Sequence, residues 1–190
     1  VIETLVRSNL FLNTKYLFKI MKTLVALFII FFLFTSSNTQ AKDSARFSLG
    51  VGVFNYMEDG SPPHNDQSGM INLEIHSGRK MFNLIKPFAG FLGTNENAYY
   101  AYGGFGIDGY YGKKKNIVWT PSLACGYYKD GNEIKAGNPL EFYIGIDVFY
   151  RFKNKARLGV GIFHISNADS GKKNPGSETL VLKYQIPFGR

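Results

Sequence analysis

This 190-residue chain has almost no cysteine and little charge. Cys125 is its single cysteine, so an internal disulfide is excluded and stability must come from elsewhere. Charged residues make up 19% of the chain, below the quarter that is usual for a soluble domain. The sequence contains no P-loop, dinucleotide fingerprint or metal-ligand spacing, so we expect neither a cofactor nor a metal.

Aromatic residues and glycine, in contrast, are abundant. Aromatics make up 16% of the chain, with 17 Phe and 12 Tyr, and there are 21 glycines. Abundant glycine and aromatics with few charges are typical of all-β membrane proteins, although a soluble β-sandwich can share this composition.

The N-terminal region predicts a secretory signal peptide. Lys22 precedes an apolar run over residues 24–34, and a polar stretch of small residues follows over 35–41. The run is too short to span a bilayer as a helix. We expect a start at Met21, an upstream extension over 1–20, a signal peptide over 21–41 with cleavage after Ala41, and one domain over 42–190. The alternative is a retained membrane anchor.

The expected mature chain is basic. It keeps 18 of the 22 basic and 13 of the 14 acidic residues, which leaves a formal net charge of +5. Export argues against nucleic acid as a partner. An anionic lipid surface is the partner that fits this charge.

The mature region shows strand periodicity and no helical periodicity. Eight segments alternate in polarity and are separated by turn residues: 45–56, 70–77, 85–92, 98–111, 117–128, 140–150, 156–165 and 178–187. Most reach the 9–11 residues that a tilted transmembrane strand needs. We therefore predict an all-β fold, an eight-stranded antiparallel β-barrel of the bacterial outer membrane, closed between its first and last strands because lipid leaves no partner for an open edge.

The last expected strand shows most clearly which face meets lipid. Leu180, Leu182, Tyr184, Ile186 and Phe188 share one face, and Thr179, Val181, Lys183 and Gln185 share the other. Large apolar residues facing lipid and small or polar ones facing a narrow lumen are what an eight-stranded barrel needs.

The lengths of the links predict the orientation. Long links follow the first, fifth and seventh strands, and shorter ones follow the even strands; outer-membrane barrels keep their long loops outside and short turns in the periplasm. Nine aromatic residues near strand ends are candidates for interfacial girdles: Tyr99, Tyr100, Tyr110, Tyr111, Trp119, Tyr127, Tyr128, Tyr143 and Tyr150.

Three polar residues stand out on the lipid-facing side of the last two strands. His164 and Ser166 share the face of Leu158, Val160 and Ile162, and Glu178 shares the face of Leu180. Ionisable groups on a lipid-exposed face are costly, so a cluster of three needs a reason. A Ser–His–acid triad supplies one, although His, Ser and Glu are also ordinary residues at a wet strand end.

These residues resemble the active-site region of the PagL lipid A deacylases. The similarity covers His-x-Ser-Asn-Ala, a loop with Asn and Gly, a Glu fourteen residues after the His, and a closing Tyr-x-Ile-Pro. It implies an outer-membrane esterase that removes the 3-hydroxyacyl chain from the 3-position of lipid A. The resemblance makes Ser166 the nucleophile, His164 the general base and Glu178 the orienting acid. Asn174, with a backbone N–H near Gly176, would help form the oxyanion hole. Asn167, at the end of the strand, has two open roles: it could orient the loop or cap the strand.

Two other functions stay open on the sequence alone. A non-enzymatic barrel for envelope integrity or adhesion would keep the fold but have no use for the triad, and a lumenal Ser166 and His164 would favour it. A phospholipase or palmitoyl transferase would be another lipid-processing barrel, but the spacing of the polar residues in the last two strands argues against it. A homo-oligomer is also open. Elsewhere, Glu74 and His76 face away from Ile71 and Leu73, which predicts a lumenal polar network.

Overall fold

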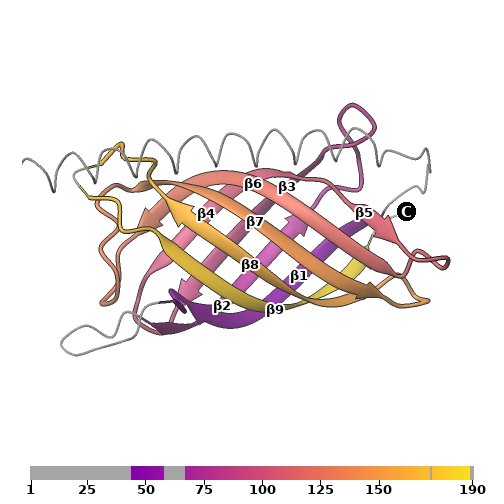
Figure 1. The fold of residues 1–190 in the computed structure, drawn as a ribbon, viewed down its shortest axis with the longest axis horizontal. Helices are drawn as coiled ribbons and strands as arrows, with labels where there is room; N and C mark the ends of the chain where they lie inside the picture. Colours follow the sequence, from indigo (N-terminus) through magenta and orange to yellow (C-terminus); the bar gives the residue numbers. More distant parts are fainter. Residues whose placement is uncertain (1–43, 58–66, 172, 189–190) are drawn as a thin grey trace, which may run out of the picture. The chain divides into compact units, whose positions relative to one another are not determined.

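The structure, a computed structural model, describes residues 44–57, 67–171 and 173–188 (Figure 1). The expected upstream extension, signal peptide and cleavage site lie outside the described residues and stay predictions. No helix among the described residues is both long enough and apolar enough to span a membrane. The part from Lys42 onward forms one compact unit and is described by itself.

Every regular element in the described part is a β-strand. In chain order the strands are β1 (Ala45–Phe54), β2 (Ser68–His76), β3 (Lys86–Thr94), β4 (Tyr99–Gly106), β5 (Gly109–Tyr111), β6 (Ile117–Lys129), β7 (Leu140–Arg151), β8 (Arg157–Ser166) and β9 (Ser177–Phe188). All eight predicted segments are present, with ends that differ by a few residues.

The strands close into a barrel, which confirms the predicted fold. Each strand pairs antiparallel with its neighbours, β4 and β5 both pair with β6, and β1 pairs with both β2 and β9. Ala45 lies opposite Phe188 and Val53 opposite Leu180, so the first and last strands are joined along almost their whole length. All strands except the short β5, which pairs with β6 alone, are thereby paired on both edges, as a structure in lipid requires. Figure 1 shows the strands running obliquely around one barrel.

The prediction of one continuous strand over 98–111 is wrong, since β4 ends at Gly106 and β5 begins at Gly109. The register continues across the break, because Gly106 pairs with Ser122 and Gly109 with Trp119. Ile107 donates its N–H to the carbonyl of Pro121 at 3.1 Å, but proline has no N–H to return the bond. The two pieces are therefore one interrupted strand of an eight-stranded barrel.

The predicted division of faces is confirmed. On β9, Leu180, Leu182, Tyr184, Ile186 and Phe188 are exposed, and the alternate residues from Thr179 to Gln185 are buried. The same alternation holds along β7 and β8. Exposed large apolar residues around the whole wall would be unfavourable in water but are the surface that lipid solvates.

Four of the tyrosines proposed for girdles point into the lumen instead, and one of them is Tyr110, whose hydroxyl bonds with the buried Asp108 and Arg157. Tyr100, Tyr128 and Tyr143 are buried, because neighbouring residues on a strand point to opposite faces. Tyr100 stacks on Tyr102 with ring centroids 4.8 Å apart, and Tyr102 stacks on Tyr143 at 5.5 Å. These rings fill the lumen near the end that carries the site.

Buried ion pairs fill the rest of the lumen. Lys183 Nζ donates to Glu74 Oε1 at 3.0 Å and to Asp147 Oδ2 at 3.1 Å, and His76 Nε2 lies 3.1 Å from Glu74 Oε2. The predicted lumenal role of Glu74 and His76 is confirmed. A second cluster joins Asp108 to Lys86 and Arg157, both at 2.8 Å. The lumen is thus plugged by paired charges and aromatic rings.

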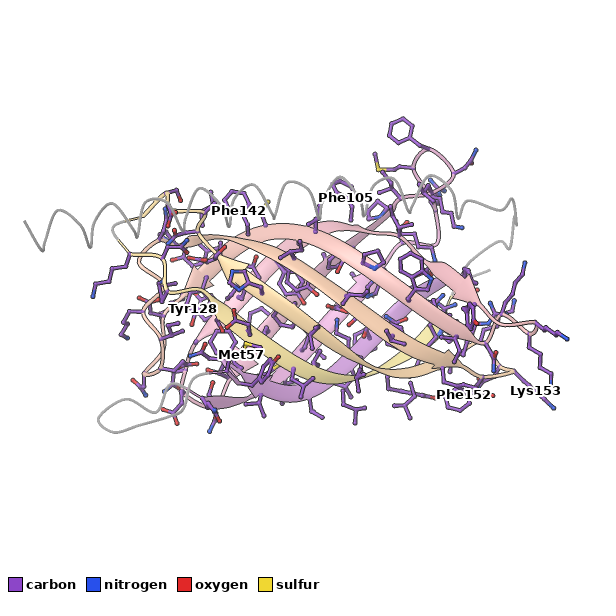
Figure 2. The ribbon with its side chains drawn as sticks, viewed as in Figure 1. Met57, Phe105, Tyr128, Phe142, Phe152 and Lys153 are labelled. Atoms are coloured by element: carbon purple, nitrogen blue, oxygen red, sulfur yellow. The ribbon has the colours of Figure 1, made fainter. Side chains whose placement is uncertain are left out.

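The links fall into two sets at opposite ends of the barrel. The end where β8 stops carries links 55–67, 95–98, 130–139 and 167–176, and the other end carries 77–85, 112–116 and 152–156. The link 77–85 is longer than its predicted extent of 78–84, because β2 ends at His76 and β3 begins at Lys86. Figure 2 shows Met57, Tyr128 and Phe142 toward the first end and Phe152 and Lys153 at the second.

Candidate functional site

His164 and Glu178 meet on the outer wall of the barrel. They lie directly opposite each other in the β8–β9 register, and His164 Nδ1 is 3.0 Å from Glu178 Oε1. Their side chains are 39% and 36% exposed, so the pair is accessible from outside. A carboxylate on Nδ1 fixes the imidazole tautomer with its proton on that nitrogen, which leaves Nε2 as the basic atom.

Ser166 is the last residue of β8 and lies on the same face two residues beyond His164. Residues two apart on a strand are about 6.4–6.8 Å apart along it and point to the same side, so Ser166 is the next residue beyond His164 on the outer wall. Its Oγ makes no hydrogen bond to His164 or to any other described residue. Bonds of this kind often tighten only when substrate is present.

The chain turns sharply just after Ser166. Ser170 donates its N–H to the carbonyl of Asn167 at 3.0 Å, and Ala168 and Asp169 have φ values of 52° and 61°. Two consecutive residues with positive φ define a type I′ turn, whose central positions favour glycine, asparagine and aspartate, so Ala168 is in a disfavoured conformation. Strained backbone of this kind recurs beside functional sites.

Asn167 fixes the loop 167–176 to the neighbouring loop 130–139. Its side chain is fully buried, and its Nδ2 donates to the carbonyls of Ala136 at 2.9 Å and Lys173 at 2.7 Å. Of the two roles that a strand-end asparagine can have, this geometry is that of a loop-orienting residue.

Asn174 is held within the same loop. Its Oδ1 accepts the backbone N–H of Asn167 at 3.1 Å, and its Nδ2 donates to Asp169 Oδ1 at 3.0 Å. Nδ2 carries two hydrogens, so one remains for a further acceptor. The bond to Asp169 fixes the direction in which that second hydrogen points.

Gly176 lies against the imidazole of His164. A Cβ at this position would be 2.7 Å from His164 Cε1, and the residue has a φ of +71°. Both observations require glycine, since the backbone is left-handed and there is no room for a side chain. The loop therefore forms one wall of the histidine site.

We expect Gly176→Ala to lower the activity of the His164 site more than the stability of the barrel. The new Cβ pushes the imidazole away from its position, and a misplacement of that size costs on the order of tenfold to a hundredfold in rate. Gly112→Ala is the matched control, because Gly112 also has a positive φ but its Cβ would meet only Asn116. Ester hydrolysis and heat-modifiable gel migration measure the two effects. Equal activity of the two variants would contradict the role given to Gly176.

Apolar residues surround the polar cluster on the wall. Phe142 and Ile144 of β7 lie opposite Ser166 and His164 in the register. Ile162 and Leu180 lie next to them on the same face, and all four side chains are exposed. The cluster opens sideways, toward lipid. The lumenal placement that would have favoured a non-enzymatic barrel is not observed.

The sequence does not predict two contacts of the site. Asp169 holds the Asn174 amide, and the Ala136 carbonyl anchors Asn167. No sequence signal identifies either, because one is an ordinary turn residue and the other acts through its backbone. No cluster of three or more metal-ligating side chains occurs among the described residues.

Solved structures show the fold that this chain shares. The crystal structure of the outer membrane enzyme PagL matches with a TM-score of 0.52 and 17% identity, covering 75% of this chain and 99% of that one. A de novo designed transmembrane β-barrel also matches at 0.52, with 10% identity and coverage of 79% and 100%. Neisserial surface protein A matches at 0.50, with 9% identity and coverage of 76% and 96%. At these identities the likeness shows the barrel fold alone.

The sequence itself matches a family model. No curated protein sequence matches the chain. The model for lipid A 3-O-deacylase (PagL) matches residues 88–187, more than half of the chain, and this span includes β8, the loop 167–176 and most of β9. The family and the barrel together place the protein in the bacterial outer membrane. The chain therefore belongs to the lipid A 3-O-deacylase (PagL) family.

Proposed function

We propose that this protein hydrolyses the ester that holds the 3-hydroxyacyl chain at the 3-position of lipid A, with Ser166, His164 and Glu178 as its catalytic triad. The 3.0 Å contact between His164 Nδ1 and Glu178 Oε1, on a face otherwise given to lipid, is the observation that carries the proposal. Placing an ionisable pair there costs free energy, and an esterase whose substrate lies in the membrane gives a reason for it.

The first half of the reaction transfers the acyl chain to the enzyme. His164 Nε2 takes the proton of Ser166 as Oγ attacks the ester carbonyl carbon, and the resulting imidazolium is stabilised by Glu178. The tetrahedral intermediate then breaks its bond to the sugar oxygen. That oxygen takes the proton from His164 and leaves as the 3-hydroxyl of lipid A, and the acyl chain remains on Ser166.

Water completes the reaction. His164 removes a proton from a water molecule as its oxygen attacks the acyl-serine, and the same proton returns to Ser166 Oγ when the bond breaks. The product is a free 3-hydroxy fatty acid. No metal or organic cofactor takes part in these steps.

The negative charge that develops on the ester oxygen needs donors. We assign the second Nδ2 hydrogen of Asn174 to this role, together with a backbone N–H near Gly176. The support is that Asn174 is already fixed by Asn167 and Asp169, so little reorganisation would accompany the reaction.

The direct test is mass spectrometry of lipid A from a bacterial host that expresses the chain. We expect loss of one ester-linked 3-hydroxyacyl chain at the 3-position and release of the corresponding free acid. Unmodified lipid A in cells with folded protein in the outer membrane would reject the function. Loss of an acyl chain from phospholipid instead would indicate a phospholipase.

We expect Glu178→Gln to slow the reaction by about 10²- to 10³-fold, less than loss of a fully buried triad acid, because water can partly replace the exposed carboxylate. The amide keeps the shape but removes the charge that stabilises the imidazolium. The loss should be in kcat with little change in KM. Glu96→Gln, a similar change in link 95–98, is the control and should keep the parent rate. Unchanged kcat in Glu178→Gln would remove Glu178 from the triad.

A further inference from the structure

The link between β2 and β3 leaves the barrel wall sideways. Figure 1 shows this segment projecting beyond the outline of the barrel near the end of the short turns, rather than continuing along the barrel axis. It ends in a tight hairpin, with Met81 donating its N–H to the Ile85 carbonyl at 2.7 Å and Leu84 donating to Met81 at 3.1 Å. The segment is therefore an ordered projection.

The tip of this hairpin is apolar and exposed. Phe82 is 85% exposed, the largest value among the large hydrophobic side chains described, and Met81 and Leu84 beside it are also exposed. Phe82 has a φ of 51°, a left-handed conformation that is rare for a bulky residue. The chain thus holds a phenylalanine in a disfavoured conformation at a point where it contacts little of the protein. The φ is that of a type I′ hairpin turn, since Asn83 also has a positive φ of 59°. Apolar surroundings from outside the chain would account for the exposed side chain.

The links at the same end of the barrel carry only positive charge. Their basic residues are Arg79, Lys80, Lys113, Lys114, Lys115, Lys153 and Lys155, and links 77–85, 112–116 and 152–156 contain no acid. The nearby Asp108 is buried against Lys86 and Arg157, so it leaves this positive charge unopposed.

The described links at the other end carry more acidic than basic residues. They carry Glu96, Asp130, Glu133 and Asp169 against Lys135 and Lys173. Among the described links, positive charge is therefore concentrated at one end of the barrel.

This end is the periplasmic one by the rule for outer-membrane barrels. The start of β1 and the end of β9 lie here, and short turns belong to the periplasmic side. Exposed aromatic side chains of Tyr111, Tyr150 and Phe152 adjoin the links, as at a membrane–water interface. The basic links therefore lie at the level of the headgroups of the inner leaflet.

We propose that this basic end binds anionic phospholipids of the inner leaflet, with the Met81–Leu84 tip inserted among them. The lysines and Arg79 attract the headgroup phosphates, while Phe82 and its neighbours occupy the apolar region just beneath the headgroups. The lipid-facing wall continues directly into this surface, so a membrane and not a soluble partner covers it. The interaction involves none of the triad residues.

Trp119, the only tryptophan of the chain, is a built-in probe for this interaction. It lies near the start of β6, beside link 112–116, and on the outer face, since its neighbours Val118 and Thr120 are buried. The intact barrel domain would be placed in nanodiscs of phosphatidylcholine with a minority of phosphatidylglycerol, and either lipid would carry brominated chains. We expect brominated phosphatidylglycerol to quench Trp119 about threefold more than its mole fraction predicts, and the excess to shrink in high salt.

A matched pair of triple variants tests whether the lysine charges cause phosphatidylglycerol to be enriched near Trp119. Replacing Lys113, Lys114 and Lys115 together by Gln should bring the quenching by the two lipids close to equality. Replacing Lys129, Lys135 and Lys173 by Gln removes the same charge at the other end and should leave the excess intact. Equal quenching in the parent protein, or an excess that survives the first triple change, overturns the proposal.

The position of the hairpin is tested separately with Phe82→Trp in a Trp119→Phe background. We expect blue-shifted emission that is quenched by lipids brominated near the headgroup. Lys173→Trp in the same background, exposed in the loop 167–176 at the other end of the barrel, is the water-exposed reference. Emission from Phe82→Trp that matches this reference would show that the tip is not in the membrane. Heat-modifiable migration confirms that each variant is folded.

Discussion

Ser166→Ala is expected to abolish release of the 3-hydroxyacyl chain while the barrel stays folded. The change removes the only atom that can form the acyl-enzyme, and loss of a triad nucleophile costs on the order of 10⁴-fold or more in kcat, about 5 kcal/mol. Stability should change little, because Ser166 ends β8 and its hydroxyl has no hydrogen-bond partner among the described residues. Mass spectrometry of lipid A measures the loss, with heat-modifiable migration as the folding control.

His164→Ala provides the matching arm of this experiment. Triad members act as a unit, so the double variant with Ser166→Ala should be scarcely slower than the worse single variant. Ser77→Ala, at the opposite end of the barrel, should keep the parent rate. Full activity in folded Ser166→Ala would show that the triad is wrong and that the non-enzymatic or other lipid-processing alternatives need to be examined.

Lys183→Met is expected to cause the largest loss of stability. The Lys183 side chain is fully buried between Glu74 and Asp147, whose side chains are 1% and 5% exposed. Removing the lysine leaves two carboxylates close together in the lumen without a cation, and breaking a buried pair in this way costs about 3–5 kcal/mol. Urea unfolding of the barrel in lipid or detergent gives the free energy of unfolding.

A compensated variant distinguishes lost charge balance from lost packing. Adding Glu74→Gln and Asp147→Asn to Lys183→Met neutralises the two carboxylates and should recover most of the stability. Lys129→Met removes an exposed lysine that lies 5.5 Å from the Tyr99 ring and should cost no more than about 1 kcal/mol. An unchanged free energy of unfolding in Lys183→Met would mean that the ion pairs of Lys183 with Glu74 and Asp147 do not stabilise the barrel.

The sequence determined the strands and their faces. Alternation on β9 places Leu180 outward and Lys183 inward whatever the neighbouring strands are, because the side-chain period of a strand is two. The same alternation, read from the sequence alone, places His164, Ser166 and Glu178 on the outer wall. The family also follows from local sequence, since its motif lies within one strand pair and the loop that joins it.

Only the tertiary structure decided the contacts between strands. The register places His164 exactly opposite Glu178, a relation that parity permits but does not fix, because β9 could slide by two residues and keep its faces. The break between β4 and β5 depends on Pro121, a residue of the partner strand. The alternation of side chains along a strand already predicts that Tyr100 and Tyr128 point into the lumen. Their assignment to girdles was therefore an error of interpretation.

The loop around the site also depended on tertiary structure. Turn residues in the sequence showed that 167–176 is a loop, but not that Gly176 would cover the imidazole or that Asp169 would hold Asn174. Those contacts arise because Asn167 fastens this loop to the carbonyl of Ala136, thirty-one residues earlier in the chain. Local sequence sets which backbone conformations a loop can adopt. Which of them is adopted is decided by packing against the neighbouring loop.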